Sequence, residues 1–175
     1  MNPETSDHTD PFQAAHWDLV PGRTAVVVID PQNDFLHPDG WYAKSNVDIS
    51  HMRRVIEPTI KLLVAARAQD VPIIWTRHGF RNEHDAGAFF KLRPFLRDGG
   101  LRQGTWGYEL YEGLGAREDD WYVEKSRLSA FFNTNLETIL RGLNADTVLM
   151  AGVLTNQCVA ATSKDASFRD FKPIM

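Results

Sequence analysis

The amino-acid sequence predicts an α/β fold with three layers, in which helices cover both faces of a parallel sheet. Segments with the pattern of strands alternate along the chain with segments of helical periodicity. The first of them, residues 24–30, is a nearly unbroken run of apolar β-branched residues, which is typical of a parallel strand buried on both faces. A length of 175 residues without internal repeats favours a single domain.

Three further strands are expected after the first one. Each is a short run of mainly apolar residues bounded by residues that favour turns. These runs cover residues 71–76, 121–124 and 147–152. Residues 172–175 have the composition of a strand that begins and does not finish, so the sheet is expected to be truncated at its C-terminal end. Because parallel strands are joined by right-handed crossovers, all strands should share one direction.

Three helices are expected from apolar residues that recur at helical spacing. Ser50 is a candidate N-cap of the first helix, and Pro58 should kink or restart that helix. Thr134 and Glu137 match the capping-box pattern, and Thr155 is a candidate N-cap of the third helix. The helices cover residues 50–69, 134–143 and 155–168, and a short helix over residues 108–114 also fits the sequence.

Residues 1–20 are expected to form a polar N-terminal arm, followed by one domain over residues 21–175. The arm lacks the features of a secretory signal, and no apolar stretch approaches the roughly 20 residues that a membrane span needs. The single cysteine cannot form an intrachain disulfide, which favours a reduced thiol and a cytoplasmic location. The 23 acidic residues against 19 basic ones, without a basic run, argue against nucleic acid as a partner.

Three reactive side chains follow the ends of predicted strands. Asp30 ends the first strand, Lys125 directly follows the third, and Cys158 follows the fourth after a short turn. In an open parallel sheet, ligands bind at the carboxyl ends of the strands. Taken singly, the cysteine would be a small buried hydrophobe and the lysine a solvated charge. Their shared position at one edge of the sheet instead predicts a catalytic site.

The predicted setting of Cys158 favours a thiolate. Residues 155–158 place its sulfur in the first turn of a helix, where the helix dipole and free N–H groups stabilise negative charge. An adjacent Lys125 ammonium would lower the thiol pKa further. Asp30 is a candidate general base, a role that is worth roughly 10²–10⁴ in rate.

Three segments that carry these residues resemble the isochorismatase-like cysteine hydrolases. They are residues 26–35 (Val-Val-Val-Ile-Asp-Pro-Gln-Asn-Asp-Phe), 124–132 (Glu-Lys-Ser-Arg-Leu-Ser-Ala-Phe-Phe) and 151–159 (Ala-Gly-Val-Leu-Thr-Asn-Gln-Cys-Val). The superfamily includes nicotinamidases, N-carbamoylsarcosine amidases, biuret hydrolases and ureidoacrylate amidohydrolases. The resemblance spans about residues 24–175. It implies a Rossmann-like sheet and cleavage of a small amide, carbamoyl or ureido compound through a thioester, with release of ammonia or an amine.

The resemblance also implies roles for particular residues. Asp30, Lys125 and Cys158 would form a catalytic triad, and the bond between Val153 and Leu154 would be a non-proline cis peptide. The N–H groups of Leu154 and Cys158 would then hold the substrate oxyanion. The sequences of the family continue past the position of Met175 with another strand and closing helices. An exposed sheet edge in their place leads us to expect a homo-oligomer, a dimer or a tetramer.

The residues around the triad indicate a branch of the superfamily. Residues 131–134 and 40–42 look most like ureidoacrylate amidohydrolases and biuret hydrolases, and Phe35, Trp41 and Phe131 are candidate walls of the substrate pocket.

Other positions depart from the patterns of these relatives. His78, Phe80 and Leu128 stand where the ureidoacrylate branch tends to have Asn, Trp and Tyr. Nicotinamidases carry an Asp-x-His metal motif after the second strand, and this chain has no such motif there. We therefore interpret His78 and His84 as loop histidines and expect no metal or other cofactor.

Two alternative functions remain open at the level of sequence. The chain could be a catalytically inert or truncated homologue that serves as an assembly subunit or a small-ligand-binding module. It could also be a flavodoxin-like binding module. The second alternative is disfavoured because Pro-Gln-Asn-Asp, rather than a loop rich in Gly, Ser or Thr, follows the first strand.

Overall fold

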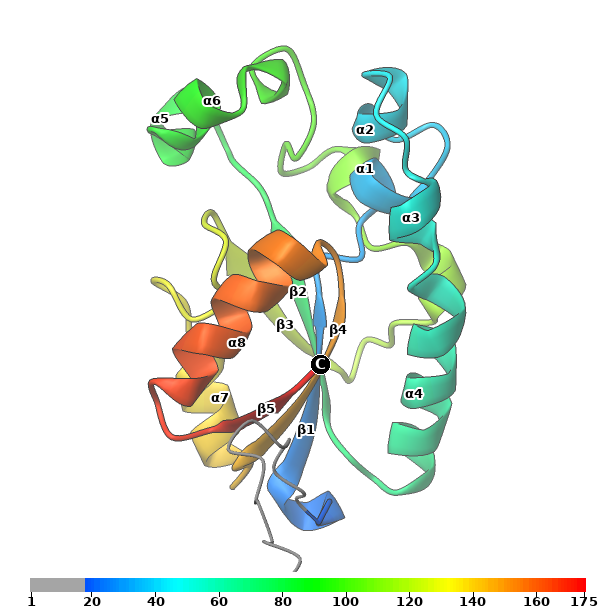
Figure 1. Cartoon of the computed structure of the whole chain (residues 1–175), viewed down its shortest axis with the longest axis vertical. Helices are drawn as coiled ribbons and strands as arrows, with labels where there is room; N and C mark the ends of the chain where they lie inside the picture. Colours follow the sequence, from blue (N-terminus) through cyan, green and yellow to red (C-terminus); the bar gives the residue numbers. More distant parts are fainter. Residues whose placement is uncertain (1–17) are drawn as a thin grey trace, which may run out of the picture.

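A five-stranded parallel sheet lies at the centre of the protein (Figure 1). The computed structural model describes residues 18–175. The strands lie in the order β3-β2-β1-β4-β5, and every neighbouring pair is parallel. Their bounds are Thr24–Ile29 (β1), Ile73–His78 (β2), Trp121–Lys125 (β3), Thr147–Gly152 (β4) and Lys172–Ile174 (β5). The predicted fold class is confirmed, and residues 172–174 do form a strand.

β1 occupies the centre of the sheet because it has apolar side chains on both faces. All six of its residues are buried. It pairs with β2 on one side and with β4 on the other. An unbroken apolar run satisfies both faces of such a strand, and this explains why the first strand was readable from sequence.

Helices cover both faces of the sheet, which gives the three predicted layers (Figure 1). On one face, α4 (Ile56–Ala68) contributes Leu63 and Ala66 to a core with β1 and β2. On the other, α7 (Leu136–Gly142) and α8 (Ala160–Ser167) close a second core. Successive residues of β1 alternate between the two cores, as the two-residue period of a strand requires.

The helix starts differ in detail from the sequence prediction. The first predicted helix divides into α3 (Ser50–Arg53) and α4, so the expected restart occurs before Pro58. Ser50 is not the N-cap: its N–H donates to the Asp48 carboxylate (2.9 Å). An Asx turn at Asp48 has taken the role that we assigned to Ser50.

The other two predicted caps are also corrected. α7 has Asn135 at its N-cap, and the Thr134 hydroxyl accepts from the Leu136 N–H (3.2 Å). Glu137 instead forms ion pairs with Arg141 and Arg169, so it completes no capping box. The third helix begins as a π-helical turn, η5 (Thr155–Val159), with no side-chain cap.

Short helices gather beyond the carboxyl ends of β1 and β2 (Figure 1). The two that follow β1 are α1 (Asn33–Leu36) and α2 (Trp41–Lys44). Those between β2 and β3 are α5 (Glu83–Ala86), α6 (Phe89–Leu92), η2 (Pro94–Leu96), η3 (Trp106–Tyr108) and η4 (Glu112–Leu114). The last two stand where we expected one short helix. A 3-10 turn, η1 (Pro21–Arg23), precedes β1.

The predicted arm, residues 1–20, lies mostly outside the described residues, which begin at position 18. Within residues 18–175, none of the helices has both the length and the apolar character that crossing a membrane requires.

Candidate active site

Asp30 lies directly after β1 and is completely buried. Its backbone adopts a left-handed conformation (φ 50°), which turns the chain sharply at the carboxyl edge of the sheet. The Thr76 hydroxyl donates to Asp30 Oδ1 (2.6 Å) and also lies 3.1 Å from the Asp30 N–H, from which it accepts. β2 thus fixes both the backbone and the carboxylate of Asp30.

Lys125, the last residue of β3, forms an ion pair with Asp30. Its Nζ lies 2.8 Å from Asp30 Oδ2, and neither side chain is exposed. The ammonium also donates to the carbonyl oxygens of Arg127 (2.9 Å) and Leu128 (3.1 Å). A buried charge is tolerated only when it is paired and hydrogen-bonded, and this arrangement meets both conditions.

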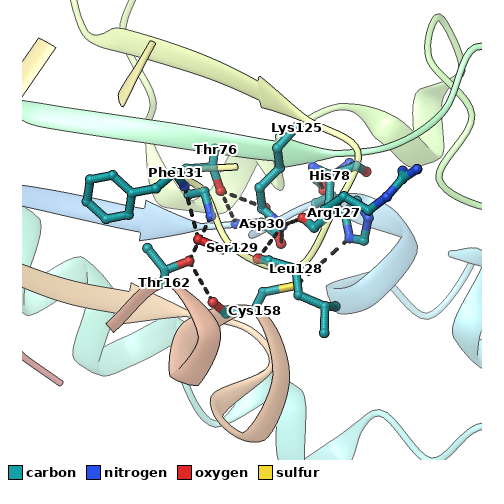
Figure 2. A network of polar contacts seen from close by, with 12 residues as sticks. Asp30, Thr76, His78, Lys125, Arg127, Leu128, Ser129, Phe131, Cys158 and Thr162 are labelled. Carbon is teal, nitrogen blue, oxygen red and sulfur yellow. Dashed lines mark hydrogen bonds and ion pairs between the residues drawn. The ribbon is translucent and has the colours of Figure 1, made fainter. Parts of the chain in front are cut away.

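Cys158 lies in the π-helical turn η5, just before α8, and is 4% exposed. The Cys158 carbonyl accepts a hydrogen bond from the Thr162 hydroxyl (2.7 Å), which anchors the turn to α8. Figure 2 shows the thiol directed toward the buried cluster of Asp30 and His78. The structure therefore brings the three predicted catalytic side chains together, from β1, β3 and the turn after β4.

The electrostatics of Cys158 differ from the sequence-based expectation. Burial, and then the negative charge of Asp30, raise the pKa of the thiol to about 12. The positive charge of Lys125 opposes this shift but does not outweigh it. We expected a lowered thiol pKa, so this is a correction: burial dominates over the ammonium and the helix start. The raised pKa favours the neutral thiol form of Cys158.

His78 is a part of the site that sequence reasoning placed in a loop. It is the last residue of β2 and 1% exposed, and its Nδ1 lies 3.9 Å from Cys158 Sγ. Its ring packs edge-on against Phe80 and Phe89. Burial, and then the charge of Lys125, hold its pKa well below the usual range, so the imidazole is neutral.

Gln32 holds the end of β2 that carries His78. The Gln32 side chain accepts from the His78 N–H (2.8 Å) and donates to the His78 carbonyl (3.1 Å). It also donates to the carbonyl of Tyr108 (2.8 Å), in the loop that precedes β3. A single buried amide thus ties together three segments of the site.

The thiol, the His78 ring and the Asp30 carboxylate also form a set of metal-binding donors. One donor atom from each lies within 4.8 Å of the others. Sulfur, nitrogen and oxygen donors of this kind suit zinc. The Asp30 carboxylate is already neutralised by Lys125 at 2.8 Å, however, and the ammonium would repel a cation. The arrangement therefore fits proton transfer better than metal binding.

The segment between β4 and Cys158 contains the implied cis peptide, between Val153 and Leu154. The Val153 N–H donates to the Ile29 carbonyl (2.8 Å), which continues the pairing of β4 with β1. The Leu154 carbonyl accepts from the Gln157 and Val159 N–H groups. Within residues 18–175, the Leu154 N–H has no hydrogen-bond partner. The oxyanion role of Leu154 and Cys158 stays a prediction.

The three candidate pocket walls lie in different places. The Trp41 ring packs over Gly99 and Gly100, and the Phe131 ring stacks on Phe171. In Figure 2 the Phe131 ring points away from the thiol. The structure does not bring Trp41 or Phe131 to Cys158.

Phe35 lies nearer to the site, through its contact with a residue that sequence reasoning missed. Its ring packs against Tyr42, with ring centroids 4.7 Å apart. Burial raises the Tyr42 pKa, and the nearby Cys158 would raise it further when ionised.

Two of the missed residues share a signal that was present in the sequence. Thr76 and His78 both lie at the carboxyl end of β2, the same edge that identified Asp30 and Lys125. We ended that strand two residues early, and His78 was therefore interpreted as a loop residue. Tyr42 gave no such signal, because it comes from a short helix beyond the sheet.

Comparison with known proteins places this fold and site among hydrolases. The chain is 33% identical to the ureidoacrylate amidohydrolase RutB of Agrobacterium fabrum, over 90% of this chain and 75% of that protein. It is 30% identical to the RutB of Acinetobacter baylyi, over 87% and 68%. The chain is a hydrolase of the class that acts on carbon–nitrogen bonds other than peptide bonds.

A solved structure and a family model agree with this assignment. A cysteine hydrolase from Pseudomonas syringae pv. phaseolicola superposes with a TM-score of 0.82 at 34% identity, over 90% of this chain and 72% of that one. The model of the isochorismatase domain matches residues 24–175. The chain belongs to the isochorismatase family, as its three motifs predicted.

Proposed function

We propose that the protein is a cysteine amidohydrolase that cleaves a small amide, carbamoyl or ureido compound through a thioester. The observation that carries this proposal is the fully buried ion pair of Lys125 and Asp30 beside the Cys158 thiol. A buried pair of charges is at best neutral for stability, so its place next to the sole cysteine supports a catalytic role.

The neutral thiol defines the first step of the proposed mechanism. Because its pKa is about 12, Cys158 loses its proton to Asp30 only as sulfur attacks the substrate carbonyl carbon. Lys125, 2.8 Å from Asp30, holds the carboxylate in place and stabilises the negative charge before transfer. The N–H groups of Leu154 and Cys158 would donate hydrogen bonds to the developing oxyanion.

The remaining steps return the enzyme to its starting state. Asp30 gives the proton to the departing nitrogen, and the carbon–nitrogen bond breaks to leave a thioester on Cys158. Asp30 then takes a proton from water as the hydroxide attacks the thioester carbonyl. The carbon–sulfur bond breaks, the proton returns to sulfur, and the acid product leaves.

The substrate class is proposed from two sources. The relatives are named ureidoacrylate amidohydrolases, which supports a carbamoyl or ureido group. Three positions where that branch tends to have other residues support a different remainder of the molecule. His78 lies 3.9 Å from the sulfur, Phe80 packs against His78, and Leu128 lines an adjacent groove. We therefore propose that the reacting group is a carbamoyl, ureido or other amide group, and that the rest of the substrate differs from acrylate.

An ammonia-release screen over small amides and ureido compounds tests the function. The natural protein should turn over at least one compound, and Cys158→Ala should lower kcat by roughly 10⁴-fold or more. Mass spectrometry of the quenched reaction should show the acyl group on Cys158. Cys158→Ser, which retains the shape of the side chain, serves as the matched control for folding. Undiminished turnover in Cys158→Ala would refute the mechanism, and an inactive natural protein would favour the inert homologue.

We also propose a cytoplasmic location and a homo-oligomeric state. The free thiol is compatible with a reducing compartment. Large apolar side chains on the surface, among them Val64 (65% exposed) and Phe168 (79% exposed), support association with further copies. Light scattering on the purified protein measures the oligomeric state directly, and a monomer at micromolar concentration would contradict this part of the proposal.

A further inference from the structure

A groove of about 380 Å³ opens beside the active site, between α6 and the segment that follows β3. Its apolar lining comes from four residues: Phe89, Leu92, Leu128 and Phe132. Leu92 (69% exposed) and Phe132 (51% exposed) present unusually large apolar surfaces to solvent. The mechanism proposed above uses none of these side chains.

Three contacts connect this groove to the reacting atoms. Leu128 lines it, and the Leu128 carbonyl lies 3.1 Å from Lys125 Nζ. Phe89 also lines the groove, and its ring packs edge-on against the ring of His78. The Nδ1 atom of His78 lies 3.9 Å from Cys158 Sγ. Leu128 also packs against the buried apolar cluster that includes Cys158. A substrate attacked by Cys158 can therefore extend into the groove.

The groove also carries a positive charge without a carboxylate partner. Arg93 lines it and donates only to the Leu92 carbonyl (3.1 Å) and to Gln157 Oε1 (3.3 Å), next in sequence to Cys158. Within residues 18–175, no Asp or Glu forms an ion pair with Arg93.

The other charges in the groove do not cancel that of Arg93. Arg127 is a second guanidinium in the lining, and its hydrogen bonds go to the backbone carbonyls of Asp85 and Ser126. Asp165 is the acidic residue of the lining, but its carboxylate accepts from Ser129 and pairs with Arg169 (3.6 Å). Arg93 is thus the guanidinium of the groove with the weakest internal partners.

We propose that this groove binds the part of the substrate remote from the reacting carbonyl, and that this part is an apolar group ending in a carboxylate. Arg93 is the specificity-determining residue that binds the carboxylate, because a guanidinium offers a planar fork that matches its two oxygens. Phe89, Leu128 and Phe132 cover the apolar group. The inference rests on the proposed function and adds the chemistry of the second half of the substrate.

Paired substrates test this assignment. We take N-carbamoyl-phenylalanine as the anionic probe and its methyl ester as the neutral one, and we measure ammonia release. Arg93→Gln should raise KM for the acid by roughly 10–100-fold and leave KM for the ester within about twofold. Arg93→Lys should restore part of the loss. Lys91→Gln, which removes an exposed charge from α6 outside the groove, is the matched control and should change neither KM.

Binding of the acid to Cys158→Ser, measured by calorimetry, gives a readout that is independent of turnover. The acid should bind Cys158→Ser more tightly than it binds the double variant with Arg93→Gln, by the same 10–100-fold. Equal binding of the acid to both proteins would overturn the role of Arg93. An equal rise in KM for acid and ester in Arg93→Gln would do the same, and either result is independent of whether the protein hydrolyses other amides. Absence of ammonia from every compound would instead overturn the proposed function, while the binding measurement still decides the role of Arg93.

Discussion

At the scale of single residues, the site is a balance between burial and charge. The Asp30 carboxylate and the Lys125 ammonium neutralise one another at 2.8 Å in a place without solvent. The thiol of Cys158 has no such partner of its own, and burial keeps it protonated. In the proposed mechanism, proton transfer to Asp30 is therefore coupled to attack on the substrate, and this coupling should limit reaction of the free thiol with other electrophiles.

The charge of Asp30 leads to a prediction with an unusual sign. Asp30→Asn should abolish turnover, yet it should make Cys158 react faster with iodoacetamide at pH 8. The negative charge of Asp30 raises the thiol pKa, so its removal lowers that pKa and increases the thiolate fraction. Rates of alkylation, followed by mass spectrometry on the folded protein, check this.

A neutral substitution and the pH profile of the natural protein serve as controls for the alkylation experiment. Thr76→Val removes a hydrogen bond to Asp30 without a change of charge, so its alkylation rate should stay close to that of the natural protein. In the natural protein the rate should climb about tenfold per pH unit through pH 9 without a plateau, because the pKa lies near 12. An alkylation rate in Asp30→Asn equal to or below the natural one would contradict the prediction.

The shared position of the three proposed catalytic residues could be predicted from sequence, but the pKa of the Cys158 thiol could not. Asp30, Lys125 and Cys158 each follow a strand that has a readable apolar pattern, and parallel strands bring such positions to one edge. The thiol pKa depends instead on how completely other side chains cover the sulfur. The surroundings of the site include Tyr42 and Phe89, which packs against His78, and both come from four-residue helices that are too short to show a periodic pattern.

At the scale of elements, the junction between β4 and η5, the turn that carries Cys158, depends on one glycine. Gly152 ends β4 with φ 113°, a conformation that side chains disfavour. A Cβ at this position would lie 2.1 Å from the Ile29 carbonyl oxygen and 2.6 Å from the Ile29 nitrogen. Close approach of β4 to β1 at this point places the Cys158 turn beside Asp30.

Gly152→Ala should therefore destabilise the protein by about 2–5 kcal/mol, through the strained φ and the clash with the backbone of β1. Denaturation by urea, with the fitted free energy of unfolding compared between the two proteins, measures the loss. Turnover of the remaining folded protein should fall as well, because the clash displaces the turn that carries Cys158.

Gly142→Ala provides the matched control for this substitution. Gly142 ends α7, and a Cβ there would meet nothing within 4 Å. Because alanine favours a helix over glycine, this variant should be unchanged or more stable by up to about 0.5–1 kcal/mol. A similar loss of unfolding free energy in both variants would contradict the explanation by strain and by the clash with β1.

At the scale of the whole molecule, the buried His78 makes global stability depend on pH. The folded-state pKa of His78 lies well below 6.5, because burial and Lys125 disfavour its charged form. Below pH 6.5 the unfolded chain takes up a proton that the folded protein refuses, so the free energy of unfolding decreases as pH falls. The loss from this group should approach about 1.4 kcal/mol per pH unit between pH 6 and the folded-state pKa.

Replacing the histidine isolates its contribution. His78→Asn cannot titrate, so its urea-unfolding free energy should fall less steeply than that of the natural protein between pH 6.5 and 5. His84→Asn replaces an exposed histidine of α5 and should retain the natural slope. Parallel slopes for the natural protein and His78→Asn would show that the buried imidazole does not control acid stability.

The order of the strands has a consequence for how activity arises during folding. β1 is the first strand along the chain, yet one of the two strands that it pairs with, β4, is the fourth. Asp30 therefore meets Cys158 only after a loop that spans most of the chain has closed, a step that costs entropy and slows folding. A polypeptide emerging from the ribosome carries the acid and the ammonium long before it carries the thiol. If the proposed mechanism holds, recovery of hydrolysis during refolding should report the closure of the β1–β4 pairing, the most distant pairing in the sheet.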